Sequence, residues 1–369
     1  MRLENLFLTL LRYKSITPQD DGALDFIQEY MDSFDAVRLD KNGTKNLLLH
    51  KKFGDGEHLC FAGHIDVVPP GIGWDSEPFE PFIKDGFVYA RGSQDMKSGV
   101  CAFLQACKEV ENFDGTISIV LTSDEEGDAK FGTIEVLKYL KQNNFLPSFA
   151  IIAEPTCENF FGDAIKIGRR GSINGVIEVF GEQGHAAYPE KSINPVNLIA
   201  PILDGLAGHY FDGGDEDFEP SQLVITDIRA GMEVTNVTPS TLKLMFNVRN
   251  GVKTDKQDIE DYINRLFKGI NFKLSLYQSA KSFVTKRDSK IVKLFQEVVK
   301  KSIDFEPKLT TSGGTSDARL FAEFGVKTVE FGVVNDRIHA LNERCRLQDV
   351  EDLKKIFDKI IENFKGTIK

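Results

Sequence analysis

Two patterns of apolar residues alternate along the first part of the chain. Short apolar runs, which are typical of strands buried on both faces, occur at residues 59–62 and 149–153, and a strongly β-prone stretch occurs at 116–122. Between them, apolar residues recur at helical spacing, as at 100–110 and 133–142. Strands that alternate with helices predict an α/β fold with a mainly parallel sheet and helices on both faces.

The pattern changes between residues 171 and 281. Apolar and polar positions alternate at 173–180 and 242–248, as in strands of an antiparallel sheet with one buried face. Helix–strand alternation of the first kind resumes near residue 289. We therefore expect a smaller α+β domain inserted into a larger one, with the larger domain at 1–170 and 282–369 and the inserted domain at 171–281.

Composition narrows the class of protein. The chain has 369 residues, of which 41% are hydrophobic and 27% charged, as in soluble globular proteins of two domains. The net charge of -11 argues against a nucleic-acid binder. We interpret residues 1–11 as an amphipathic helix and not as a signal peptide, and no segment has the run of ~20 apolar residues that a membrane helix needs. The five cysteines form no Cys-x-x-Cys motif, so we expect reduced, mostly buried thiols in a cytoplasmic protein without a membrane partner.

Acidic and imidazole side chains follow the predicted strands where each strand ends. In α/β sheets, sites form at the carboxyl ends of the strands. The groups found there are His64, Asp66, Asp95, Glu125, Glu126, Glu154 and, after a later strand, His339. Each acid alone is more often a helix cap or a surface charge. Their repeated occurrence at strand ends indicates a shared site instead.

Five of these residues form a candidate metal-binding set. Two imidazoles and three carboxylates suit Zn²⁺, and they also suit Co²⁺ or Mn²⁺. One catalytic Zn²⁺ usually takes three protein ligands and a water, so five ligands fit two ions that share a bridging carboxylate. The set comprises His64, Asp95, Glu126, Glu154 and His339.

The remaining two acids have separate predicted roles. Glu125 and Glu126 are adjacent, so one can bind metal while the other faces the reacting water. Asp66 lies two residues after His64 and on the same side, where it can orient the imidazole ring.

Four sequence motifs of the chain resemble those of a known family. The resemblance is carried by GHIDVVP at 63–69, ARGSQDMKSG at 90–99, SDEEG at 123–127 and EPT at 154–156. Over nearly its whole length, the chain resembles the dinuclear zinc amidohydrolases of the aminoacylase/carboxypeptidase clan. Within that clan, KIGRRGS at 166–172 and SGGTSDAR at 312–319 are similar to the succinyl-diaminopimelate desuccinylases rather than to acetylornithine deacetylases or glutamate carboxypeptidases.

The resemblance implies a role for each metal ligand. His64 and Glu154 would hold one zinc ion, Glu126 and His339 would hold the other, and Asp95 would bridge the two. In the family, the peptide bond after the bridging aspartate is cis.

The resemblance also implies catalytic roles and a partner. Glu125 would be the general base, and Asp66 would assist from behind His64. His185, in the inserted domain, would reach the active site of a partner subunit and donate to the oxyanion. The inserted domain would thus be a lid and the dimerisation unit of a homodimer.

The implied substrate is a small anionic molecule, N-succinyl-LL-2,6-diaminoheptanedioate. Its hydrolysis gives succinate and LL-2,6-diaminoheptanedioate, an intermediate of diaminopimelate and lysine biosynthesis. The substrate carries three carboxylates, and guanidinium groups bind carboxylates in a two-pronged manner. Arg169 and Arg249 are therefore candidate anchors, and by similarity Asn236, Gly314 and Thr315 would add hydrogen bonds.

Two alternatives stay open. One is a deacylase of the same clan that acts on another N-acyl amino acid, or a dipeptidase. The other is a catalytically silent relative that binds a metal or a peptide, against which the presence of Glu125 argues. A purely structural zinc site would favour a closed set of cysteines.

Overall fold

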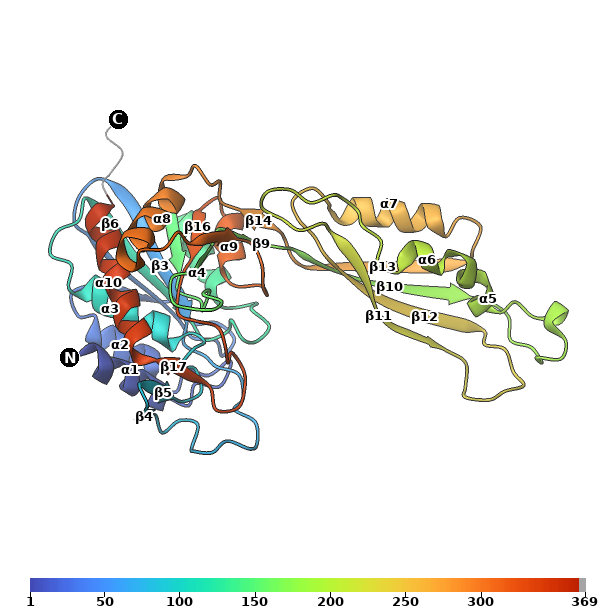
Figure 1. Ribbon diagram of the computed structural model, residues 1–369, viewed down its shortest axis with the longest axis horizontal. Coiled ribbons are helices and arrows are strands. Elements are labelled where there is room, and N and C mark those ends of the chain that lie inside the picture. The colour runs from blue at the N-terminus through green and yellow to red at the C-terminus, as the bar shows by residue number, and fades with distance from the viewer. Residues whose placement is uncertain (365–369) are drawn as a thin grey trace. The chain divides into compact units, whose positions relative to one another are not determined.

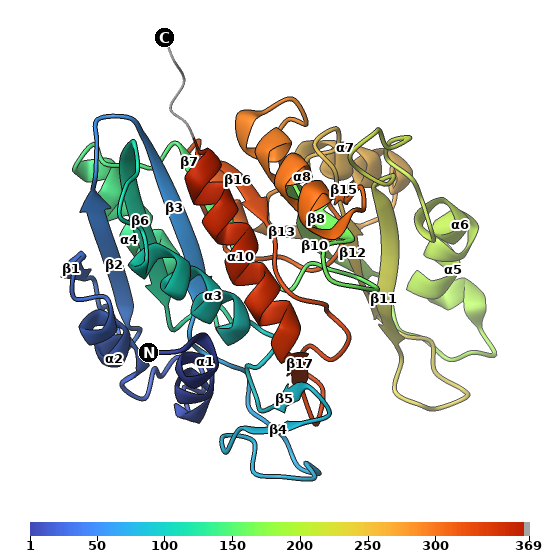
Figure 2. The same cartoon turned by 60° about the vertical axis from the view of Figure 1, so that its left-hand side comes forward.

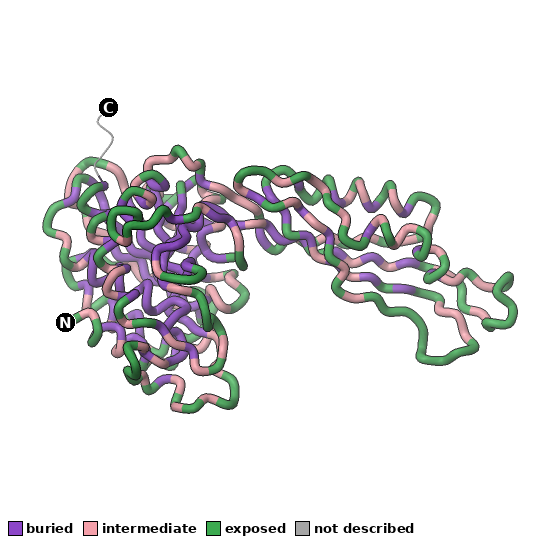
Figure 3. The backbone as a smooth tube through the Cα atoms, in the orientation of Figure 1, coloured by how far each residue is buried: buried purple, intermediate pink, exposed green. Residues whose placement is uncertain are grey.

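The structure of the protein, a computed structural model, describes residues 1–364 and divides into two compact units (Figure 1). Of the described residues, the first unit comprises Met1–Gly168, Thr285–Thr310 and 316–364. The second comprises Arg169–Val284 and Thr311–Thr315. Each unit has a sheet and a buried core of its own (Figure 3). The predicted mixed α/β class is confirmed.

The first unit contains an eight-stranded sheet that is parallel at its centre. In spatial order its strands are β1 (Asp35–Arg38), β2 (Asn46–Lys52), β6 (Gly115–Thr122), β3 (Glu57–His64), β7 (Phe149–Ile152), β16 (Lys327–Glu330), β8 (Ala164–Lys166) and β15 (Lys308–Thr310). The strands β6, β3, β7 and β16 run parallel, whereas β1 and β2 form an antiparallel edge. Because β3 pairs with both β6 and β7, the carboxyl ends of these three strands share one edge of the sheet.

Helices cover both faces of this sheet (Figure 2). They are α1 (Leu3–Arg12), α2 (Ala23–Tyr30), α3 (Lys97–Lys108), α4 (Thr133–Gln142), α8 (Lys290–Ile303), α9 (Ala318–Glu323) and α10 (Leu347–Asn363). The packing of β3 shows why its apolar run is continuous. The ring of Phe61 contacts the ring of Phe103 in α3 and that of Phe357 in α10, and all three are fully buried. Burial of such a ring contributes several kcal/mol, since Phe→Ala in a core costs about 3–5 kcal/mol.

A small sheet in the first unit joins distant parts of the sequence. It contains β4 (Phe82–Lys84), β5 (Phe87–Tyr89) and β17 (Arg344–Arg346). Because Cys345 in β17 pairs with Val88 in β5, the segment after His339 lies beside the segment that leads to Asp95. This pairing brings two of the predicted ligand-bearing loops together.

The second unit contains a four-stranded antiparallel sheet in the order β11 (Gln222–Ala230), β12 (Thr241–Arg249), β10 (Ser172–Phe180) and β13 (Phe272–Ala280). Its helical segments are η1 (Pro189–Lys191), α5 (Pro195–Ile199), η2 (Ala200–Ile202), α6 (Leu203–Leu206) and α7 (Lys256–Leu266). Alternate residues of β10 and β12 are buried, so the period-two pattern reflects one covered face.

Two short strands, β9 (Gly168–Arg169) and β14 (Phe283–Val284), pair where the chain enters and leaves this stretch. The five cysteines are buried and form no disulfide in the described part of the chain. Within residues 1–364, no helix combines the length and the apolar character needed to cross a bilayer.

Candidate active site

The first unit places all five predicted metal ligands at one edge of its sheet. His64 is the last residue of β3, and Glu154 follows the end of β7 by two residues. Glu126 lies in the turn after β6, and Asp95 lies just before α3. His339 comes from the loop between β16 and β17.

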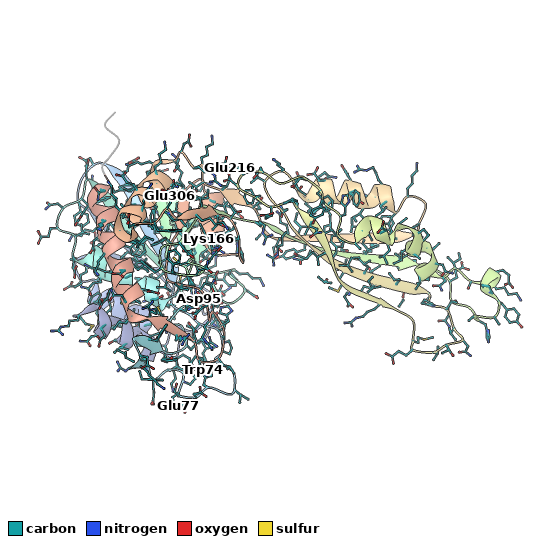
Figure 4. All side chains as sticks on the ribbon, in the orientation of Figure 1. Trp74, Glu77, Asp95, Lys166, Glu216 and Glu306 are labelled. Atoms are coloured by element: carbon teal, nitrogen blue, oxygen red, sulfur yellow. The ribbon has the colours of Figure 1, made fainter. Side chains whose placement is uncertain are left out.

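Asp95, labelled in Figure 4, lies between two imidazole rings. Its Oδ1 is 3.2 Å from Nε2 of His64, and its Oδ2 is 3.1 Å from Nε2 of His339. The same nitrogen of each ring also faces a further carboxylate. Oε1 of Glu126 is 2.8 Å from Nε2 of His339, and Oε1 of Glu154 is 3.9 Å from Nε2 of His64. The ligand atoms of His64, Asp95 and Glu126 all lie within 4.8 Å of one another.

Three carboxylates and two imidazole rings are gathered in this cluster. Burial opposes a charged ring at His64, but Asp95 and the neighbouring carboxylates raise the pKa of His64 well above its usual value. Hydrogen bonds with Asp95 and Glu126 raise the pKa of His339 to about 10. Burial raises the pKa of Glu154 well above its usual value, and the charge of Asp95 raises it further. These shifts mark a concentration of negative charge that bound divalent ions would neutralise.

The orientation of His64 also fits a metal ligand. Its Nδ1 lies 2.9 Å from the main-chain oxygen of Asp66, to which it can donate a hydrogen bond. In the neutral ring, Nε2 then carries the lone pair, and that atom faces Asp95 and Glu154. A metal-binding histidine characteristically has its second nitrogen fixed in this way. The residues present therefore fit a divalent metal centre.

Asp66 contacts both the His64 ring and the turn that carries Glu125 and Glu126. Oδ1 of Asp66 is 3.6 Å from Nδ1 of His64, and the shorter contact comes from the main-chain carbonyl. The carboxylate also accepts hydrogen bonds from the main-chain N–H of Glu126, at 3.1 Å, and of Glu125, at 3.5 Å. Asp66 thus ties the end of β3 to the turn that carries both glutamates.

Glu125 belongs to the same cluster but has a different environment from Glu126. Burial raises the pKa of Glu125 well above its usual value, while the positive charge of His64 acts in the opposite direction. Whereas Glu126 contacts His339, Glu125 has His64, Asp95 and Glu126 among its charged neighbours. A buried carboxylate beside a metal-binding set is suited to exchange a proton with a reacting water.

Two local backbone features occur near these residues. The Asp95–Met96 peptide bond is cis, which confirms what the resemblance implied. Gly99, in the first turn of α3, packs against the residue before Glu154. A Cβ at this position would lie 2.1 Å from the main-chain oxygen of Ala153, so only glycine allows this approach.

The predicted substrate-binding residues belong to the second unit. Arg169 is buried, and its guanidinium donates to the main-chain oxygen of Gly314 at 3.0 Å. Arg249 is exposed at the end of β12 and, with Arg170, lines a cavity of about 620 Å³. Thr315 is exposed beside Gly314.

His185 and Asn236 lie on neighbouring loops of the same unit. The main-chain N–H of Ala186 donates to the main-chain oxygen of Asn236 at 2.9 Å. His185 and Val237 form an isolated antiparallel β-bridge. Both side chains are exposed. Nδ1 of His185 accepts a hydrogen bond from the N–H of Ala187 at 3.1 Å, which leaves Nε2 as the outer nitrogen of the ring.

Two further residues of the site region escaped prediction from the sequence. Arg91 was recognised only as part of a motif, and Glu343 was not singled out. Both are nearly fully buried and form an ion pair of 2.7 Å, Arg91 Nη1 to Glu343 Oε2. Their burial, which depends on contacts between distant segments, is the property that distinguishes them from surface charges.

Comparison with known proteins identifies the family of the chain. Residues 60–363 match peptidase family M20/M25/M40. The succinyl-diaminopimelate desuccinylase of Nitratiruptor sp. is 60% identical over 364 residues, which cover 99% of this chain and 100% of that protein. The enzyme of the same name from Nautilia profundicola is 57% identical over 364 residues, with the same coverage of both chains.

Solved structures share the fold at low identity. An aminopeptidase from Bacillus cereus has a TM-score of 0.80 and 20% identity, covering 98% of this chain and 97% of that one. A dinuclear metal-binding peptidase of family M20 from Bacillus subtilis has a TM-score of 0.74 and 15% identity, covering 98% and 96%. Since the family match and the similarity to these relatives extend over most of the sequence, the chain belongs to peptidase family M20/M25/M40.

Proposed function

We propose that the protein hydrolyses N-succinyl-LL-2,6-diaminoheptanedioate to succinate and LL-2,6-diaminoheptanedioate. The observation that carries the proposal is the position of Asp95 between His64 and His339, with the carboxylates of Glu126 and Glu154 beside the two rings. The choice of substrate is supported by relatives that are named succinyl-diaminopimelate desuccinylase and are 57–60% identical over 99% of the chain.

The donor set supports two divalent ions, Zn²⁺ or its substitutes Co²⁺ and Mn²⁺. His64 and Glu154 would hold one ion, His339 and Glu126 would hold the other, and Asp95 would contact both. When bound, the ions make a water acidic enough to act as a nucleophile near neutral pH and polarise the scissile carbonyl.

The protein groups then handle the protons. The Glu125 carboxylate takes a proton from the attacking water and returns it to the leaving nitrogen of the amide. The buried position of Glu125 supports this role, because burial favours the protonated form that must follow the first transfer. Asp66 holds the main chain of Glu125 and so fixes where its side chain starts.

Recognition of the substrate falls to the second unit. Arg249 and Arg170 give the 620 Å³ cavity two guanidinium groups that suit carboxylates. Arg169 holds the loop of Gly314 and Thr315, which with Asn236 adds hydrogen bonds. His185, from the partner subunit of a homodimer, donates to the oxyanion of the tetrahedral intermediate, and the second unit serves as lid and dimerisation domain.

Metal analysis combined with a desuccinylation assay on the purified protein tests the proposal. We expect two divalent ions per chain and release of succinate from the succinylated substrate. Faster turnover of N-acetylornithine or of a dipeptide would favour a different deacylase or a dipeptidase. Two bound ions without hydrolysis of any of these compounds would favour a catalytically silent relative.

A further inference from the structure

The carboxylate of Glu343 bonds to the main chain of the segment that carries Asp95. Oε1 accepts from the N–H of Gln94 at 2.7 Å and from that of Asp95 itself at 3.1 Å. Oε2 accepts from the N–H of Gly92 at 3.0 Å and from the Arg91 guanidinium at 2.7 Å. With two donors on each oxygen, the carboxylate fixes the path of the main chain into Asp95.

Arg91 extends this arrangement to the loop that carries His339. Its Nη2 donates to the main-chain oxygen of His339 and to that of Pro70, each at 3.3 Å. The guanidinium also lies over the ring of Trp74, with 5.2 Å between its central carbon and the ring centroid. One buried ion pair therefore contacts the main chain of both Asp95 and His339.

Gln94 provides a second connection between the same two loops. Its Nε2 donates to Oδ1 of Asp336 at 2.6 Å and to the main-chain oxygen of Arg344 at 3.1 Å. Its Oε1 accepts from the main-chain N–H of Arg337 at 2.8 Å. The residue before Asp95 is thus bonded to residues on both sides of His339.

The main-chain atoms to which Arg91 and Glu343 bond indicate that the pair positions the metal-binding loops and does not merely stabilise the fold. A buried ion pair is weak evidence for stability, because the cost of removing both charges from water offsets much of their attraction. Here the pair bonds to main-chain atoms of two loops whose side chains must face each other across a few ångströms. Loss of a residue that orients metal ligands without binding the metal itself commonly lowers metal affinity by roughly 10–100-fold.

We propose that the Glu343–Arg91 pair is a positioning element that sets the separation of Asp95 and His339 and thereby the affinity of the metal centre. The proposal rests on the metal centre described above. Both residues are nearly fully buried, and we assign them no contact with the substrate. Their effect is transmitted through the main chain of the two ligand-bearing loops.

The test is a Zn²⁺ titration of the metal-free full-length protein against a competing chelator. Glu343→Gln keeps the shape of the side chain but directs an N–H₂ group at main-chain N–H donors, so we expect the affinity for Zn²⁺ to fall roughly 10–100-fold. Arg91→Lys keeps the charge and loses the fork that reaches the main-chain oxygen of His339. It should lower the affinity in the same direction, and it replaces Glu343→Gln if that variant does not fold.

A matched control separates positioning from general loss of stability. The buried carboxylate of Asp163 also accepts three main-chain N–H bonds, from Glu158, Asn159 and Phe160. Asp163→Asn should lower the melting temperature of the metal-free protein and leave Zn²⁺ affinity within about twofold. The visible absorption of the Co²⁺-loaded protein should change in Glu343→Gln and not in Asp163→Asn.

The outcomes are separable. Zn²⁺ affinity and a Co²⁺ spectrum equal to those of the wild type in both Glu343→Gln and Arg91→Lys would overturn the positioning role alone. An equal loss of affinity in Asp163→Asn would also overturn it, because any destabilised variant would then behave alike. A wild-type protein that binds no divalent ion would overturn the metal centre itself, and the positioning role with it.

Discussion

Replacement of Glu125 by glutamine separates proton transfer from metal binding. Glu125→Gln preserves the size of the side chain and removes its ability to accept a proton. The same change one residue later, Glu126→Gln, provides a matched comparison, because Oε1 of Glu126 lies 2.8 Å from Nε2 of His339 within the proposed ligand set. The two variants should fail in different ways.

The charges of the cluster predict that Glu125→Gln retains its ions. Five carboxylates lie close to His64 and His339, and two divalent ions would leave one negative charge uncompensated. These are the carboxylates of Asp66, Asp95, Glu125, Glu126 and Glu154. In the Glu125→Gln variant, the same two ions balance the remaining four. Loss of a general base typically costs 10²–10⁴-fold in rate, or about 3–5 kcal/mol of transition-state stabilisation.

The assay combines kcat for succinate release with metal content after dialysis. Glu125→Gln should keep two ions and lose roughly 10²–10⁴-fold in kcat, whereas Glu126→Gln should lose metal. Metal loss in Glu125→Gln with retention in Glu126→Gln would show that the two roles are exchanged. A wild-type kcat for Glu125→Gln would place the base elsewhere.

Three further predictions concern other parts of the chain. His185→Ala should lower kcat without changing metal content, and a wild-type rate would remove the proposed donor. Arg249→Ala should raise KM roughly 10–100-fold, since a hydrogen bond to a charged group contributes about 1.5–3 kcal/mol; an unchanged KM would assign the carboxylate to another residue. Gly99→Ala should destabilise the first unit by about 1–3 kcal/mol in denaturant unfolding, because its Cβ meets the main-chain oxygen of Ala153. Gly205→Ala, whose Cβ would be 3.1 Å from the mobile end of Leu266, should have a smaller effect, and equal effects would contradict the packing argument.

The sequence predicts the strands that are recognisable from a stretch of apolar residues, and the polar residues that follow directly after such a stretch. The strands β3, β6 and β7 are mostly buried, so apolar and β-branched residues dominate them and their ends are visible in the sequence. His64 and Glu154 stand at such ends, and a parallel sheet necessarily brings the ends together. Geometry at this level follows from periodicity and from the direction of the strands.

Contacts between distant segments could not be predicted from the pattern of apolar and polar residues. Glu343 lies in a loop and has the composition of a surface residue, and only the pairing of β17 with β5 places it beneath Asp95. Strands of three residues, such as β17, are too short to show a period. For Asp66, the spacing from His64 indicates which side of the strand it faces. It does not distinguish the carbonyl from the carboxylate as the group that meets the ring.

The pairing of β9 with β14 bears on how such a protein can diversify. The 116 residues from Arg169 to Val284 begin and end in two strands that are hydrogen-bonded neighbours. A segment with adjacent ends can be lengthened, shortened or exchanged for another without opening the sheet that hosts it. If the second unit recognises the substrate, as proposed, exchange of this segment would change specificity and leave the ligand set of the first unit in place.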